Sequence, residues 1–257
     1  MTHRSSVASE LYIFVTAPRA DPYVNVLMYL LRNRAISGIH YVSVVEHGYT
    51  SEQMEDRLSD IEANVGILFD QLTDGFYGSK EIELDPAWRE AYRECRQRLD
   101  RIRVERITIS WSDLDAELGR FLEADAVIFD VTTLKKNLLV DVVALLLSRG
   151  RTEIFSFEQV TSGQPRYDNR GLIHALSPNG FVYRSVAESK HVEKARARFV
   201  AKAITFRAAL VLTFIVGLVV ITIQVFFANT TLESIILAIA TVAAIASWLY
   251  TFVRADG

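Results

Sequence analysis

Polar and basic side chains follow two apolar stretches of this 257-residue chain, and their types suit an anionic ligand. The first group begins at the end of the run LYIFVTA, and the second begins at the end of the run DAVIFD. Hydroxyl groups, positive charges and free backbone N–H groups at the start of a helix are the parts that hold phosphate in proteins. The sequence therefore predicts a phosphate-type ligand at seven residues: Thr16, Arg19, Asp130, Thr132, Thr133, Lys135 and Lys136.

The second group also has a purely structural interpretation. Asp130 and the two threonines would cap the helix that follows them, and the two lysines would be solvated surface charges. Neither group matches a P-loop, and no glycine-rich dinucleotide fingerprint follows the first apolar run.

Catalytic and metal-binding patterns are weak in this sequence. The best enzymatic candidate is Glu46, which would serve as the carboxylate of a nucleoside- or NAD-cleaving enzyme; its alternative is a surface charge at a strand end. No Ser/His/Asp or Cys/His order is present. The five histidines lack metal-ligand spacing, and Cys95 is the only cysteine. We therefore assign no catalytic residue, no metal ligand and no cofactor.

The two polar groups are positioned by a predicted alternation of strands and helices. Strands are predicted at five short, apolar runs: 11–17, 39–46, 104–110, 125–130 and 152–157. This alternation predicts an α/β domain with a Rossmann-like, mostly parallel sheet and right-handed crossovers. Ligands bind such sheets beyond the carboxyl ends of the strands, where both polar groups lie.

Capping signals predict where the helices begin. Thr50 with Gln53 forms a capping box that opens a helix through about Gln71. The pairs Asp21-Pro22 and Asp85-Pro86 each combine an N-cap residue with a proline in the first turn. Two further helices are predicted, one capped by Ser112 or Asp113 and one at 137–148. Residues 172–176 and 180–185 suggest a β-hairpin.

Two segments near the C-terminus are each long enough to cross a membrane. Residues 208–227 form a segment of twenty residues and residues 234–252 one of nineteen, and neither contains a charge. At about 1.5 Å per residue, each spans a hydrocarbon core of about 30 Å. The linker between them permits only a tight turn. The sequence thus predicts a two-helix transmembrane hairpin; the alternative is a pair of buried helices in a soluble protein.

Basic residues predict how this hairpin is oriented. Six Lys/Arg residues lie between positions 190 and 207 and Arg254 follows the second span, whereas Glu233 is the only charge in the turn. The positive-inside rule then places both termini in the cytoplasm, in a multi-pass protein of the cell inner membrane. The predicted organisation is a cytosolic domain at 1–186, a basic juxtamembrane helix at 187–207 and the hairpin at 208–254.

Small and polar residues recur at four-residue spacing within the predicted spans. Such spacing lets helices approach closely, either within one hairpin or in an oligomeric pore. Two spans enclose a channel only when several copies assemble, so we expect a homo-oligomer. The residues predicted to pack the hairpin or line a pore are Thr213, Gly217, Gln224, Ala240, Ala244 and Ser247.

The balance of charged residues indicates which kinds of partner the chain can bind. The chain has a formal net charge of −3, and its first 189 residues hold 21 Lys/Arg against 28 Asp/Glu. A domain that binds duplex nucleic acid needs a net basic face, so we expect none here. A small anionic ligand held by a few local groups remains compatible with this charge.

The unit DAVIFDVTTLKKNLLVDVVALLL resembles a known element. It is similar to the Asp-x-Thr/Ser-x-x-Lys element of CRISPR-associated Rossmann-fold (CARF) sensor domains, with Thr132-Thr133 where those domains have a glycine pair. A sensor joined to a membrane hairpin also resembles bacterial anti-phage membrane effectors. The resemblance implies a dimer that binds a nucleotide or oligonucleotide second messenger. It assigns five residues to that ligand: Thr16, Arg19, Thr132, Thr133 and Lys135.

Three hypotheses for function follow. The first is an effector that senses a nucleotide signal and oligomerises to permeabilise the lipid bilayer. The second is a membrane-anchored enzyme that cleaves a nucleoside or NAD, with Glu46 or Asp130 as its carboxylate. The third is a non-catalytic adaptor that docks a partner at the membrane.

Overall fold

The computed structural model describes residues 8–45, 48–121, 126–160, 168–189 and 192. These residues form a six-stranded sheet with the order β5-β2-β1-β6-β7-β8. Its strands are β1 (Ser9–Phe14), β2 (Ile36–Val45), β5 (Arg103–Ser110), β6 (Val127–Asp130), β7 (Ile154–Gln159) and β8 (Phe181–Ser185). All neighbouring strands are parallel except β8, which runs antiparallel to β7. The predicted α/β class with a mostly parallel sheet is confirmed.

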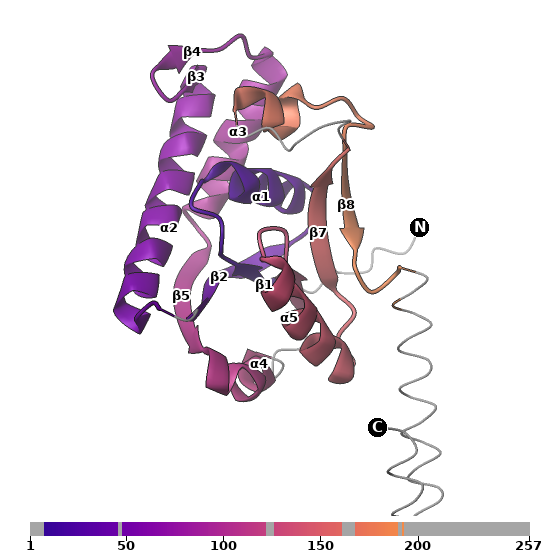
Figure 1. Ribbon diagram of the computed structural model, residues 1–257. Helices are drawn as coiled ribbons and strands as arrows, with labels where there is room; N and C mark the ends of the chain where they lie inside the picture. Colours follow the sequence, from indigo (N-terminus) through magenta and orange to yellow (C-terminus); the bar gives the residue numbers. More distant parts are fainter. Residues whose placement is uncertain (1–7, 46–47, 122–125, 161–167, 190–191, 193–257) are drawn as a thin grey trace, which may run out of the picture. The chain divides into compact units, whose positions relative to one another are not determined.

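Helices cover both faces of the sheet (Figure 1). The first three, α1 (Asp21–Asn33), α2 (Ser51–Asp74) and α3 (Pro86–Leu99), share one buried core with one face. The other two, α4 (Leu114–Phe121) and α5 (Lys136–Ser148), share a second core with the opposite face. The chain therefore crosses from one face to the other after β5.

The central strand β1 is apolar from Leu11 to Phe14, where both of its faces are buried. Leu11 and Ile13 belong to the core under α1, α2 and α3, whereas Tyr12 and Phe14 belong to the core under α4 and α5. Successive side chains of a strand point to opposite faces, so a strand between two helical layers needs an uninterrupted apolar run.

Two of the predicted capping signals are confirmed. The Thr50 N–H donates to Gln53 Oε1 at 2.9 Å, and the Gln53 N–H donates to Thr50 Oγ1 at 3.2 Å, which completes the capping box of α2. The Ala87 N–H donates to Asp85 Oδ1 at 2.8 Å at the start of α3. Helix α2 ends at Gly75, whose φ of 84° is left-handed, a few residues beyond the predicted end.

The predicted N-cap at Asp21 was wrong, and a residue far away in sequence interacts with this side chain instead. Asp21 lies in the first turn of α1 rather than at its N-cap, and it accepts a hydrogen bond from Tyr77 of the small hairpin β3 (Phe76–Tyr77)–β4 (Lys80–Glu81). Ser112 and Asp113 belong to a 3-10 helix, η1 (Trp111–Asp113), which ends directly before α4, so the predicted cap at one of these residues stays a prediction.

The predicted β-hairpin at 172–185 was also wrong. Only its second arm is a strand, β8, and that strand pairs with β7. The first arm contains the 3-10 turn η3 (Ile173–Ala175), which follows a second such turn, η2 (Asn169–Gly171). Leu172 and Ile173 are buried in the core next to α1, which fixes this segment against the helix instead of against β8.

Several predictions lie outside the described residues. These are Glu46, most of the predicted juxtamembrane helix, and the hairpin at 208–254 with Thr213, Gly217, Gln224, Ala240, Ala244 and Ser247. Within the described residues, none of the helices has both the length and the apolar character that crossing a bilayer requires.

Asn25 of α1 gives the first testable prediction, because it satisfies a buried backbone group. The Ile173 N–H donates to Asn25 Oδ1 at 2.8 Å, and Asn25 Nδ2 donates to Gly171 O at 2.9 Å. Asn25→Ala leaves that buried N–H without a partner, so the free energy of unfolding should fall by roughly 1–3 kcal/mol. Urea unfolding of the full-length chain in detergent measures this change.

The matched control is Asn33→Ala, in the last turn of the same helix. Asn33 Nδ2 donates to Tyr29 O at 2.7 Å from an exposed position, where water replaces the lost bond. This control should change the free energy of unfolding by less than about 0.5 kcal/mol. Equal effects of the two substitutions would contradict the bridging role of Asn25.

Candidate functional site

The structure brings the two predicted polar groups together at the centre of the sheet. Strands β1 and β6 are hydrogen-bonded neighbours, with Ile13 opposite Asp130. From β1 the chain continues through α1 toward β2, and from β6 it continues through α5 toward β7, on the opposite face. In open α/β sheets, ligands bind beyond the carboxyl ends of the two strands where the direction of winding reverses. The residues after β1 and β6 occupy that position.

Thr133 joins the two loops. Its hydroxyl donates to Phe14 O at 2.7 Å and accepts from the Thr16 N–H at 3.2 Å. The Thr16 hydroxyl in turn donates to Thr133 O. Two of the three hydroxyls predicted to contact a ligand, those of Thr16 and Thr133, thus hold the loops to each other in this structure. Their direct contact with a ligand stays a prediction.

Two residues that sequence reasoning missed complete this junction. Tyr23 of α1 accepts from the Ala17 N–H at 3.1 Å, and its Oη lies 3.2 Å from Thr133 Oγ1. Burial raises the pKa of Tyr23 to about 12, so the phenol stays neutral. The half-buried Arg57 of α2 donates to Thr16 O. Nothing in the sequence distinguishes Arg57 from the other charged residues of α2.

The side chain of Asp130 is fully buried, and it is hydrogen-bonded to other residues of the domain. Its Oδ1 accepts from the Thr132 N–H at 3.1 Å, and its Oδ2 accepts from the Thr132 hydroxyl at 2.9 Å and from the Tyr183 hydroxyl at 3.0 Å. Burial raises the pKa of Asp130 to about 7, although these hydrogen bonds oppose the shift. The carboxylate therefore connects the loop after β6 to β8, and its burial leaves it no direct access to a substrate.

Thr132 connects the same loop to β7. Its Oγ1 accepts from the Phe157 N–H at 2.8 Å. Neither Asp130 nor the two threonines cap α5, since Lys135 occupies the N-cap position and no side chain caps the helix there. The purely structural interpretation of this loop was therefore wrong about the cap.

The exposed positive charges flank the junction. Lys135 and Lys136 are solvent-exposed at the start of α5, next to its first-turn N–H groups. Arg19 is exposed just before α1, and its charge acts on Tyr77, whose pKa burial and Asp21 raise and Arg19 partly lowers. Exposed cations are suited to an anionic ligand, whereas the hydroxyls of Thr16 and Thr133 already donate to backbone carbonyls.

Among the described residues, no group of three or more His, Cys, Asp or Glu side chains is arranged to hold a metal ion. Cys95 is buried in α3, where burial raises the pKa of its thiol.

No family model, curated protein or solved structure matches the chain.

Asp130→Asn tests the burial of this carboxyl group through pH. The pKa of this carboxyl is about 3.8 in the unfolded chain and about 7 in the folded one, so the protonated form favours folding. Its contribution to the free energy of unfolding is therefore lost as pH rises from about 4 to about 7. The asparagine has no such titration. The stability of D130N relative to the unsubstituted chain should therefore increase across this window and level off above it.

Urea unfolding of both chains at several pH values measures the difference. His174, whose pKa burial lowers to about 4, contributes a trend of opposite sign in the same window, but it does so equally in both chains and cancels. A difference that stays constant from pH 4 to pH 8 would show that Asp130 is not buried as described.

Proposed function

We propose that the described domain is a Rossmann-like sensor of a nucleotide-type signal and belongs to a membrane effector, as in anti-phage defence. One observation carries the proposal: Thr133 ties the loop after β6 to the end of β1, so that the two sequence-predicted groups share one edge of the sheet. The phosphate-suited groups of the sequence thus lie at the position where folds of this type bind ligands.

The contacts indicate different roles for the residues at this edge of the sheet. Thr16, Thr133 and Tyr23 set the positions of the loops, while Lys135 and Lys136 supply charge. A phosphate group beside the start of α5 would also receive hydrogen bonds from the uncapped first-turn N–H groups. No step of this proposal requires a reaction, because binding alone shifts a population between two states.

The membrane part of the proposal rests on the sequence. The two charge-free segments at 208–227 and 234–252 suit a transmembrane hairpin with both termini in the cytoplasm. In the proposed effector, ligand binding promotes homo-oligomers whose hairpins permeabilise the inner membrane. The small-residue spacing within the segments supports close helix packing in such an assembly.

Nucleotide binding by the purified full-length chain tests the sensor role. The probes are ATP, cyclic di-AMP and a cyclic triadenylate, with inorganic pyrophosphate to detect binding of phosphate alone. At least one nucleotide should bind the unsubstituted chain in calorimetry. Lys135→Ala/Lys136→Ala should weaken that binding about tenfold or more, because each charge-assisted contact contributes roughly 1.5–3 kcal/mol.

The control variant is Arg93→Ala/Arg120→Ala, which also removes two exposed cations. Both arginines form surface ion pairs within their own helices, with Glu90 and Glu117 respectively, and neither lies in the loops after β1 and β6. This variant should bind the nucleotide as tightly as the unsubstituted chain. Equal weakening by both double variants, or no binding of any nucleotide, would contradict the proposed site.

A further inference from the structure

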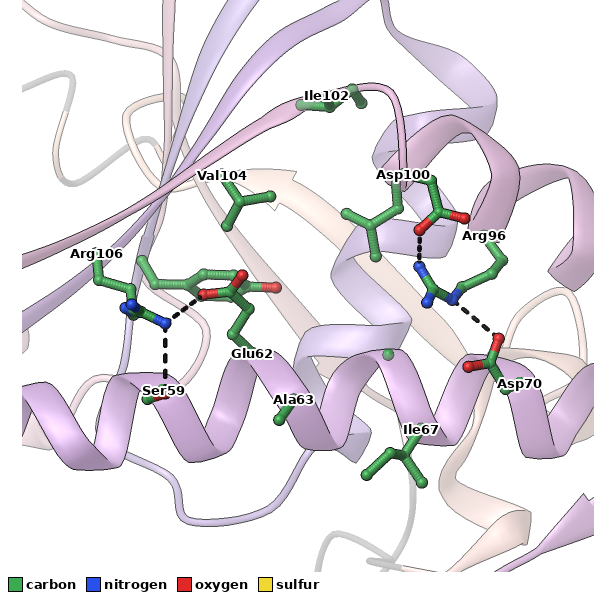
Figure 2. A pocket seen from close by; sticks show the side chains of 13 residues that line it. Ser59, Glu62, Ala63, Ile67, Asp70, Arg96, Asp100, Ile102, Val104 and Arg106 are labelled. Atoms are coloured by element: carbon green, nitrogen blue, oxygen red, sulfur yellow. Dashed lines mark hydrogen bonds and ion pairs between the residues drawn. The ribbon is translucent and has the colours of Figure 1, made fainter.

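A cavity of about 510 Å³ lies between β5, α2 and the end of α3. It is separate from the candidate site above, because none of its lining residues belongs to the loops after β1 and β6. Figure 2 shows that it has two polar ends, with the apolar residues Ala63, Ile67 and Ile102 between them. Ile67 is 51% exposed, so part of this apolar surface is open to solvent. The middle of the cavity therefore suits the apolar body of a ligand.

One polar end contains a neutralised ion pair. Arg106 of β5 donates to Glu62 Oε2 at 3.1 Å and to Ser59 Oγ at 3.3 Å, both on α2 (Figure 2). One guanidinium thus faces one carboxylate. This end of the cavity has no surplus charge for an ionic ligand.

The same end contains a buried hydroxyl group that has no hydrogen-bond partner within the described residues, that of Tyr41. Tyr41 of β2 lies opposite Arg106 in the strand register and lines the cavity, and only 1% of its surface is exposed. Burial raises the pKa of Tyr41, and the charge of Glu62 raises it further, so the neutral phenol end lies near that carboxylate. A buried hydroxyl without a partner is costly, and a polar group of a ligand would remove this cost.

The other polar end has one surplus negative charge. Arg96 of α3 donates to Asp70 Oδ1 at 2.9 Å and also pairs with Asp100 Oδ1 (Figure 2). Two carboxylates thus share one guanidinium, and each directs only one of its oxygens at it. The second oxygens are suited to an ammonium group, which forms charge-assisted hydrogen bonds with carboxylates.

The distance between the two ends limits the size of a ligand. Glu62 and Asp70 are eight residues apart on α2, which corresponds to about 12 Å along the helix. A molecule that contacts both ends is therefore a small organic compound. An anion would meet the surplus negative charge, and a purely apolar molecule would leave the hydroxyl of Tyr41 unpaired.

We propose that this cavity binds a small organic amine that carries a hydroxyl group at its other end. The ammonium group of the ligand lies at Asp70 and Asp100. Its apolar body packs on Ile67, and its hydroxyl group is hydrogen-bonded to Tyr41. This site is distinct from the proposed nucleotide site, and it does not depend on that proposal.

Calorimetry on the purified full-length chain in detergent tests this site with three probes that share one apolar body. Tyramine has both an ammonium group and a hydroxyl, phenethylamine has only the ammonium group, and 2-(4-hydroxyphenyl)ethanol replaces the ammonium group with a neutral one. Titration into detergent alone corrects for partition into micelles. Tyramine should bind roughly fivefold or more tightly than either of the other probes, since each lacks one polar contact. Absence of tyramine binding, or equal affinity for all three probes, would overturn the proposal.

Tyr41→Phe tests the contact with the hydroxyl group. It keeps the buried ring and removes only a hydroxyl that has no hydrogen-bond partner among the described residues, so the fold should be retained. This variant should bind tyramine roughly fivefold more weakly and phenethylamine as tightly as the unsubstituted chain does. Equal weakening for both probes would show that Tyr41 does not contact the hydroxyl of the ligand.

Asp70→Asn tests the end that would hold the ammonium group. It should weaken the binding of both amines about threefold, because a charge pair at a partly exposed site contributes modestly, and leave the neutral alcohol unaffected. The matched control is Asp141→Asn, which removes an exposed carboxylate of α5, on the opposite face of the sheet. The control should bind all three probes as the unsubstituted chain does. Equal weakening by both substitutions would reduce the effect to the overall charge of the domain and contradict the site.

Discussion

The hydrogen bonds of the Thr133 side chain hold the centre of this protein together. One hydroxyl donates to Phe14 O and accepts from the Thr16 N–H, so the loop after β6 is fixed against the end of β1. Helices α1 and α5 each begin a few residues beyond these loops. The positions of the exposed lysines, and with them the candidate ligand site, depend on this contact.

Burial on both faces of the sheet imposes a second constraint. A polar group at the end of a central strand must find partners within the protein, since an unpaired buried carboxyl is costly. Asp130 meets this requirement through Thr132 and Tyr183, and through Tyr183 it couples the loop to β8. Strand β8 is the last described strand before the apolar C-terminal segments. The hydrogen bonds of Asp130 therefore connect the candidate site to the described strand that lies nearest in sequence to those segments.

Sequence patterns predicted the elements whose causes are local. The apolar run around Leu11 predicted a buried strand, and Thr50 with Gln53 predicted a capping box; the structure contains both. Patterns were wrong where a distant residue decides the outcome. Asp21 interacts with Tyr77 instead of capping its helix, and the segment at Leu172 packs on α1 instead of on β8.

Part of the candidate site was predictable because the positions of some of its residues also follow from local sequence patterns. Thr16, Thr133 and the lysines lie at strand ends, which the alternation of strands and helices reveals. Tyr23 and Arg57 were missed because their roles come from contacts between α1, α2 and the loop after β1. The hydroxyl of Thr133 was expected to face a ligand, and only the fold shows that it faces backbone groups.

Membrane potential in bacterial cells that express the full chain tests the central claim most directly. With phage infection as the trigger, the account predicts depolarisation that is lost on truncation after Ala187 and on Lys135→Ala/Lys136→Ala, and that persists in Arg93→Ala/Arg120→Ala. Depolarisation that survives the lysine substitutions, or its absence in cells with the unsubstituted chain, would contradict a ligand-controlled membrane effector.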